Sequence, residues 1–409
     1  MHGLPPASPG RRALLVLSLT VNLGLLGFFK YFDFLALNVF LLAYTAGFPR
    51  FPILHVGLAL PIGLSFYTFE SMSYTIDVYR GRLKPERRLR NFLLFISFFP
   101  HLVAGPIVRA RDFLYQIERR RRPRALVMLE GAYLMIRGFF LKIVLADNLA
   151  RIVDASWKSA AAPRANATLT LLLTVLFALQ ILCDFDGYST IARGAAFLFG
   201  FRLPRNFNSP YVAGTFREFW QRWHITLSQW LRDYLYVPLG GNRKGRVRTY
   251  VNLFIVMLLG GLWHGAAWNF VIWGALHGAL LGFERLRGKA ALYGGLPAPM
   301  RVGVTFTIVL ITWVFFRAPD LRQAFSYLGD MLALGRPQEG AGLLAGMVYQ
   351  PYYLATFLLA GAIVWRAPQT WDWTRTLTLP KVAAILVVLV LSAVVLATQG
   401  YNPFIYYIF

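Results

Sequence analysis

The chain alternates long apolar runs with short basic connections. Several runs approach 20 residues, the length that an α-helix needs to cross the hydrocarbon of a bilayer. Examples are Ala13–Phe29, Ala167–Phe185, Leu343–Trp365 and Val382–Leu396. We count roughly ten apolar segments and expect some of them to enter the membrane without crossing it. The pattern predicts an all-α, polytopic membrane protein whose residues 1–409 form a single transmembrane domain.

One interrupted apolar segment, residues 91–108, lies between two strongly basic stretches. Residues 79–90 hold six Lys or Arg, and residues 109–124 hold seven. Short basic loops remain on the cytoplasmic side of a membrane. Since both flanks are basic and Pro100 and Pro106 interrupt the segment, we expect it to enter the membrane and return. Its irregular backbone would then be buried in protein or line a cavity.

A second apolar segment, residues 250–283, has the same flanking pattern, with basic residues at 243–248 and 285–289. At about 1.5 Å per residue it is too long for one crossing. Three glycines, at positions 260, 261 and 265, lie near its middle, where they weaken a helix. We therefore expect a hairpin of two short limbs with His264 near its turn, deep in the membrane.

Residues 216–235 show a different pattern, with apolar side chains at i, i+3 and i+4 spacing and charged residues between them. This periodicity predicts one amphipathic helix. Its charged face favours a helix that lies at the membrane interface or lines a cavity. His224 falls at the edge of the apolar stripe.

The net charge of +24 results from 42 Lys and Arg against 18 Asp and Glu. In a soluble protein this excess would favour nucleic-acid binding. Here the basic residues lie in short loops between apolar runs, as membrane topology requires. The expected partner is thus the lipid bilayer and not a nucleic acid. The only cysteine, Cys183, excludes an intrachain disulfide and a multi-cysteine site, and we expect no bound metal.

The histidines are the candidate chemical groups. An ionisable side chain inside a membrane segment is a functional hypothesis by default, and glycines around His264 leave room for a ligand. The alternative for His264 is a core histidine bonded to a backbone carbonyl, and for His224 a structural hydrogen bond beneath the amphipathic helix. His101 and His277 are interpreted as structural. No zinc-hydrolase, serine-hydrolase or P-loop motif is present.

Short motifs follow one another along nearly the whole chain. They are Leu60–Tyr67, Asp77–Gly81, Phe99–Pro106, Lys142–Asp147, Asp184–Ser189, Asn206–Asn208, Trp223–Ser228, Pro238–Arg243 and Leu262–Gly265. Together they resemble the membrane-bound O-acyltransferase family, in particular its bacterial branch. That branch includes the alginate O-acetylation membrane subunit, which fits better, and the D-alanine transfer protein of teichoic acids.

The chain departs from the family pattern at a few positions. Asp186 stands where the family usually has Ser, Thr190 replaces an Asp, and Gln221 replaces a common Arg. Compared with this branch, the chain also begins late and lacks one or two of the usual N-terminal spans, so either the start codon is misplaced or the bundle is trimmed. The late start affects the outer rim of the fold more than its centre.

The resemblance implies acyl transfer to a hydroxyl group, which needs a base whose pKa lies near neutrality, such as imidazole. His264 would be this base. His224, near Trp220 and Trp223, would shape the path of the thioester or assist the leaving thiolate. Asp184 and Asn208 would orient these groups. The expected substrate and donor cavity comprises Trp220, Arg222, Trp223, Asp184, Asn208, Asn242 and Trp263.

The acyl donor would be a cytoplasmic thioester, acetyl-coenzyme A or a phosphopantetheine carrier protein, used as a substrate with no bound cofactor. Basic loops would attract its phosphates. The resemblance implies a bacterial inner-membrane enzyme that moves the acyl group toward hydroxyls of an exported polysaccharide, together with a periplasmic acetyltransferase or acceptor protein. Two alternatives remain open: transfer of D-alanine or another acyl group, and a transporter or scaffold that passes a donor without catalysis.

The chain ends in an aromatic tail, residues 402–409. Tails of this type in the family imply that Tyr406 accepts the acyl group transiently and relays it. The alternative is an aromatic anchor at the membrane interface. The sequence does not separate the two.

Overall fold

The structure, a computed structural model, describes residues 8–48, 50–119, 123–157, 166–288, 291–334, 341–367, 373, 376 and 378–400. These residues form helices and no strand, which confirms the predicted all-α fold. The N-terminal helices are α1 (Pro9–Leu26), η1 (Gly27–Tyr31), α2 (Phe32–Thr45), α3 (Leu64–Tyr79), α4 (Leu89–Ser97), α5 (Phe99–Leu102) and α6 (Ala110–Glu118). The central helices are α7 (Ala125–Phe139), η2 (Phe140–Ala146), α8 (Asp147–Trp157), α9 (Ala167–Leu198), η3 (Pro210–Val212), α10 (Phe216–Arg222), α11 (Ile225–Leu231) and η4 (Arg232–Tyr236). The C-terminal helices are α12 (Gly245–His264), α13 (Trp268–Leu286), α14 (Ala298–Arg317), α15 (Leu321–Met331), α16 (Ala341–Val348), α17 (Pro351–Arg366) and α19 (Leu379–Thr398).

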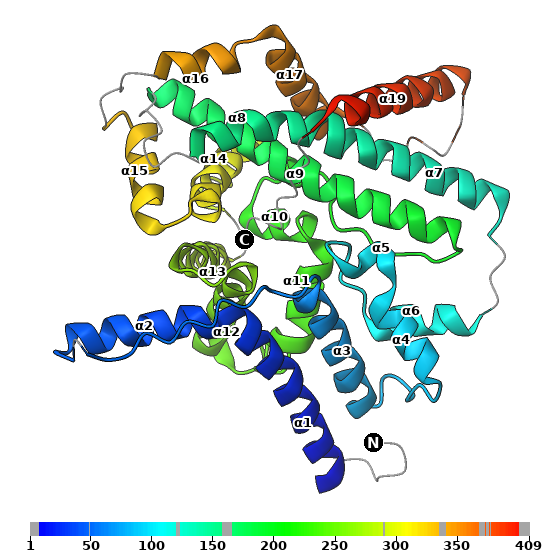
Figure 1. The fold of residues 1–409 in the computed structure, drawn as a ribbon, viewed down its shortest axis with the longest axis vertical. Coiled ribbons are helices and arrows are strands. Elements are labelled where there is room, and N and C mark those ends of the chain that lie inside the picture. The colour runs from blue at the N-terminus through cyan, green and yellow to red at the C-terminus, as the bar shows by residue number, and fades with distance from the viewer. Residues whose placement is uncertain are drawn as a thin grey trace.

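The long helix α9 forms the centre of the bundle. Its most apolar window is 78% buried, whereas those of α1–α2 and α19 are 6% buried. Figure 1 shows α7 alongside α9, with α8, α14 and α17 around them. The pair α12 and α13 lies closer to the N-terminal helices α1 to α3. Apolar helices that bury so little of their surface face lipid, so α1, α2 and α19 form the rim of the fold.

Five helical stretches in the described part of the chain are long and apolar enough to cross a membrane. They are Pro9–Thr45, Ala167–Leu198, Gly245–His264, Ala298–Arg317 and Leu379–Thr398. Some apolar runs of the sequence are divided between shorter helices. The run at 343–365 is one of these, because α16 ends at Val348 and α17 begins at Pro351. Proline has no backbone N–H and is tolerated in the first turn of a helix but not in its interior.

The segment between the two basic stretches has the irregular backbone that its prolines and glycine predicted. It forms two short helices, α4 and α5, and then a non-helical stretch from Val103 to Arg109. Side chains accept hydrogen bonds from two N–H groups of this stretch. Thr226 Oγ1 accepts from Ile107 N at 3.0 Å and Glu70 Oε1 from Val108 N at 3.3 Å. The surrounding protein thus replaces the helical hydrogen bonds that this stretch lacks. The membrane face from which it enters remains a prediction.

Candidate active site

The predicted hairpin is confirmed. Helix α12 ends at His264, three residues turn the chain, and α13 begins at Trp268. A Cβ atom on Gly261 would lie 2.3 Å from the carbonyl oxygen of Phe270 and 2.9 Å from Cα of Gly274, so the limbs touch through their backbones. The limbs are longer than expected, since 20 residues of α12 span about 30 Å. The depth of His264 in the membrane remains a prediction.

His264 is enclosed by aromatic rings. His264 is only 8% exposed. The centroid of its imidazole lies 4.9 Å from that of Trp263, 5.3 Å from that of Trp273 and 5.1 Å from that of Phe316. These rings come from α12, α13 and α14, so three helices fix the imidazole plane. Their apolar surfaces bury most of the residue.

The prediction of one continuous amphipathic helix over residues 216–235 is wrong. Helix α10 ends at Arg222, α11 begins at Ile225, and His224 between them has a left-handed backbone with φ of 39°. A distant segment causes the break. Asn208 N donates to Arg222 O at 3.0 Å, and Ile225 N donates to the carbonyl oxygen of Asn206 at 2.8 Å. Hydrogen bonds to this segment replace the helical bonds that are lost at the break.

The break places the His224 ring in the interior of the protein. His224 is fully buried, and its ring lies 4.7 Å from Phe185 and 6.1 Å from Trp263 between centroids. Among the residues that the structure describes, neither ring nitrogen has a hydrogen-bond partner. Buried polar groups are nearly always bonded, so an exception of this kind requires an explanation. Trp263 contacts both His224 and His264, and the two predicted histidines therefore belong to one aromatic cluster.

A third histidine, His277, lies in the same cluster and has a defined tautomer. Trp220 Nε1, which can only donate, bonds to His277 Nδ1 at 3.2 Å, so Nδ1 carries no proton. Nε2 is then the protonated nitrogen and donates to Thr312 Oγ1 at 3.1 Å. The Thr312 hydroxyl donates in turn to Val309 O. This neutral histidine joins α10, α13 and α14, in agreement with its interpretation as structural.

Three more predicted site residues lie around the break. Trp220 belongs to the cluster through its bond to His277. Trp223 is buried against Trp313, with centroids 4.9 Å apart. Arg222 donates to Glu218 Oε1 at 2.9 Å and to Asn208 O at 3.1 Å. Arg222 and Asn208 thus hold the loop that breaks the helix.

Asp184 lies in a buried ion cluster on α9. Lys142 Nζ is 2.5 Å from Asp147 Oδ1 and 3.0 Å from Asp184 Oδ1. One lysine between two carboxylates joins η2 and α8 to α9. The neighbouring residue, Phe185, contacts His224. Asp184 is therefore connected to the histidine cluster through its position on α9, while the predicted orienting role remains a prediction.

One predicted residue, Asn242, is not brought to the cluster. Asn242 is exposed and precedes α12, whereas His264 lies at the other end of that helix, about 30 Å along its axis. The sequence motif that contains Asn242 gave no information on this separation. Tyr406 lies outside the described residues.

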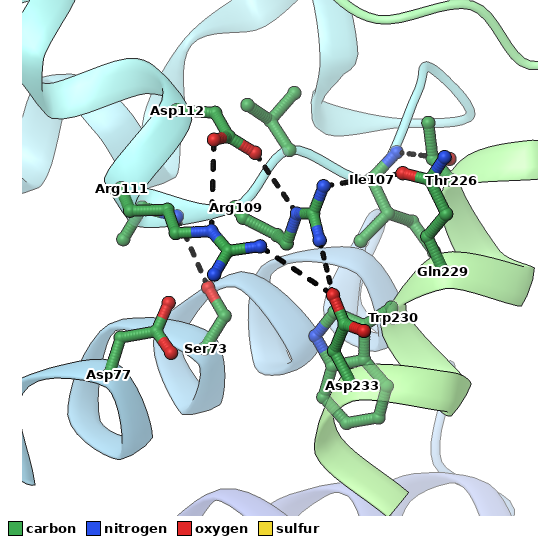
Figure 2. A network of polar contacts seen from close by, with 12 residues as sticks. Ser73, Asp77, Ile107, Arg109, Arg111, Asp112, Thr226, Gln229, Trp230 and Asp233 are labelled. Carbon is green, nitrogen blue, oxygen red and sulfur yellow. Dashed lines mark hydrogen bonds and ion pairs between the residues drawn. The ribbon is translucent and has the colours of Figure 1, made fainter. Parts of the chain in front are cut away.

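A polar network fixes the segment that follows His224 (Figure 2). Arg109 donates to Asp233 Oδ2 at 2.5 Å and to Asp112 Oδ2 at 3.0 Å, and Arg111 lies 3.5 Å from Asp233. Burial acts to raise the pKa of Asp233, but the hydrogen bond from Arg232 and the charges of the arginines lower this pKa below its ordinary value. The network joins η4 to the irregular stretch before α6.

The sequence analysis did not identify Lys30, whose Nζ lies 3.1 Å from the carbonyl oxygen of His264. It also missed the ion pair of Arg109 with Asp233 and the role of His277 in joining three helices. Lys30 follows an apolar run and is indistinguishable from an ordinary basic flank. Arg109 lies in a basic stretch that topology already explains. A signal existed for His277, because it lies four residues after Trp273 and so shares a helical face with it.

Comparisons with known proteins identify the family of the chain. The model of the membrane-bound O-acyltransferase family matches residues 61–316. The chain belongs to this family. It is therefore a multi-pass membrane enzyme, an O-acyltransferase.

Curated relatives refine the comparison. The "Probable alginate O-acetylase AlgI" of Pseudomonas putida is 39% identical over 423 residues, which cover 98% of this chain and 85% of that protein. The peptidoglycan O-acetyltransferase of Helicobacter pylori is 37% identical over 355 residues, 79% of this chain and 65% of that protein. The teichoic acid D-alanyltransferase of Bacillus subtilis is 28% identical over 271 residues, 62% and 67% of the respective chains.

Proposed function

We propose that this enzyme moves an acetyl group from a cytoplasmic thioester toward hydroxyls of an exported, alginate-like polysaccharide. The similarity to O-acetylases at 37% and 39% identity supports acetyl over D-alanyl, for which the relative is 28% identical. A donor made in the cytoplasm and a polymer outside it imply the bacterial inner membrane. A periplasmic acetyltransferase or acceptor protein would complete delivery.

The observation that carries the proposal is His264 at the end of α12, enclosed by Trp263, Trp273 and Phe316. A neutral imidazole held there takes the proton of the attacking hydroxyl while its oxygen bonds to the thioester carbonyl carbon. The tetrahedral intermediate collapses, the carbon–sulfur bond breaks, and the imidazolium returns the proton to the thiolate. The product is an oxygen ester and a free thiol. General-base catalysis of this kind contributes roughly 100- to 10,000-fold to rate.

His224 would assist on the other side of Trp263, where its unbonded ring nitrogens are available to the thioester or the leaving thiolate. The donor is acetyl-coenzyme A or a phosphopantetheine carrier, consumed as a substrate. Tyr406 remains a candidate relay, tested by replacement with Phe, because full transfer by Tyr406→Phe would remove that step.

The decisive experiment measures ester-linked acetyl in the exported polysaccharide of a deletion strain. The strain is complemented with wild type, His264→Ala, or the control His55→Ala, which removes an exposed histidine. We expect acetyl content at wild-type level with His55→Ala and a loss of roughly 100-fold or more with His264→Ala. The amount of enzyme in the membrane is measured in parallel. Normal acetylation by His264→Ala would contradict the proposed base and favour a transporter or scaffold.

A further inference from the structure

Two side chains from the N-terminal helix reach the end of α12 beside His264. Lys30 Nζ lies 2.5 Å from the carbonyl oxygen of Trp263 and 3.1 Å from that of His264. Tyr31 Oη donates to the carbonyl oxygen of Leu262 at 2.9 Å. Three successive carbonyls at the end of the helix therefore receive hydrogen bonds from a segment more than two hundred positions away in the sequence.

These carbonyls need such partners. The last four C=O groups of a helix accept no hydrogen bond from N–H groups of the same helix. Together they carry a partial negative charge that favours a nearby cation. The Lys30 ammonium supplies this cation, and it also lies 5.9 Å from the centroid of the Trp263 ring, over its face. Within the part of the chain that the structure describes, Lys30 forms no ion pair with a carboxylate. The helix end and the indole are its partners there.

The local backbone explains how both side chains reach one helix end. Residues Gly27–Tyr31 form a π-helical turn between α1 and α2. Such turns hold one residue more than an α-helical turn and occur often at functional sites. A second attachment follows on α2, where Asn38 Oδ1 accepts from Trp268 Nε1 at 2.8 Å. The N-terminal helix therefore holds both sides of the turn at 265–267, and Figure 1 shows α1 and α2 passing beside α12.

We propose that Lys30 is a positioning residue for acyl transfer, which holds the last turn of α12 and with it the imidazole of His264. The inference depends on the proposed function of His264. Residues 265–267, Gly-Ala-Ala, have no large side chain to fix the turn, and terminal turns of helices are the ones that fray. Removal of the Lys30 ammonium releases this turn. The imidazole then loses its alignment with the hydroxyl, although substrate binding elsewhere is retained.

The test compares Lys30→Met, Lys30→Arg and Lys381→Met in the purified full-length chain. Lys381 is a matched control because its ammonium also bonds carbonyls, those of Trp373 and Thr376, at the start of the rim helix α19. Thiol release from acetyl-coenzyme A in the presence of a polyuronate oligosaccharide gives kcat and KM. We expect Lys30→Met to lower kcat roughly 10- to 100-fold with little change in KM, since small misplacements of a catalytic group have effects of this size. Lys30→Arg restores most of the lost kcat, and Lys381→Met retains wild-type values.

Each outcome decides the inference. Wild-type kcat in folded Lys30→Met overturns it, as does a loss that only follows the fraction of folded enzyme or a loss that Lys30→Arg fails to restore. If Lys30→Met does not fold, Tyr31→Phe removes a single hydroxyl donor, and we expect a smaller fall in kcat at unchanged KM. Unchanged kcat in Tyr31→Phe then overturns the inference. Activity in His264→Ala removes the proposed function itself, so the two failures are distinguishable.

Discussion

His224 combines two properties that are unfavourable for stability. Its backbone is left-handed, and its buried ring nitrogens have no hydrogen-bond partner among the described residues. A histidine that served stability alone would gain little from this position, because an apolar ring would fill the same space without unbonded polar atoms. Strained and unsatisfied residues are concentrated at functional sites. The residue is therefore a candidate for chemistry.

The substitution His224→Phe separates a role of this residue in stability from a role in catalysis. Phenylalanine keeps an aromatic ring, slightly larger than imidazole, against Phe185 and Trp263 and removes the two nitrogen atoms. We expect the stability of the purified enzyme to change by about 1 kcal/mol or less, because no hydrogen bond is lost, and acyl transfer to fall at least about tenfold. Thermal unfolding in detergent and acetyl content of the polysaccharide measure the two effects. Full activity in a stable variant would show that the ring only fills space.

At the scale of elements, the hairpin of α12 and α13 explains how a histidine reaches the protein interior from two basic loops. Both ends of the hairpin, Gly245 and Arg287, lie beside basic residues, and both are expected on the cytoplasmic face. Backbone contact at Gly261 and Gly274 holds the limbs together. The limbs therefore support His264 as one unit.

Cysteine labelling tests this topology. The only native cysteine, Cys183, is buried, so a Cys183→Ala background carries Gly245→Cys or Arg287→Cys. We expect an impermeant maleimide to label both positions only after the membrane is opened, because both lie on the cytoplasmic face. A cysteine at Ala266, near the turn, serves as a control for depth. Labelling of positions 245 and 287 from opposite faces would exclude the hairpin topology.

The sequence predicted those elements whose cause is local. Glycines at 260 to 265 and basic flanks mark the hairpin, and prolines at 100 and 106 mark the irregular segment. The break at His224 has no local cause, because the apolar spacing of residues 216–235 continues through it. Asn206 and Asn208 impose the break through hydrogen bonds from another part of the chain. Lys30 was missed for the same reason, since its partner carbonyls lie in α12.

At the scale of the whole molecule, the network in Figure 2 adds ion pairs to the other hydrogen bonds that join η4 to the N-terminal helices, such as the one from Tyr234 Oη to Asp77 Oδ2. Asp233 on η4 binds Arg109, and the backbone beside Arg109 is attached to α3, where Ser73 Oγ accepts from Ala110 N at 3.3 Å. The segment after His224 is thus fixed to the N-terminal helices.

Asp233→Asn tests the contribution of this network. The folded pKa of Asp233 lies below the ordinary value of an aspartate, so ionised Asp233 stabilises the fold above its unfolded pKa, and this stabilisation is lost as pH falls through the folded pKa. We expect the variant to be less stable by about 1 kcal/mol at pH 7, because a partly exposed pair is screened. The difference should shrink as pH falls below about 4. Thermal unfolding at both pH values is the measurement.

The control Asp112→Asn removes a half-exposed carboxylate and should lower stability less. An equal loss of stability would contradict the central position of Asp233 in the network.

The π-helical turn at Gly27–Tyr31 makes the register of the first helix part of the catalytic apparatus. Loss of one residue there would restore the ordinary helical pitch and rotate everything before it by about 100° relative to α2. The outer surface of that helix would be apolar in either register, so membrane insertion would be unaffected by the change. The insertion or deletion of one residue in a lipid-facing helix is usually regarded as neutral. In this enzyme it would displace the side chains that hold the helix end beside His264.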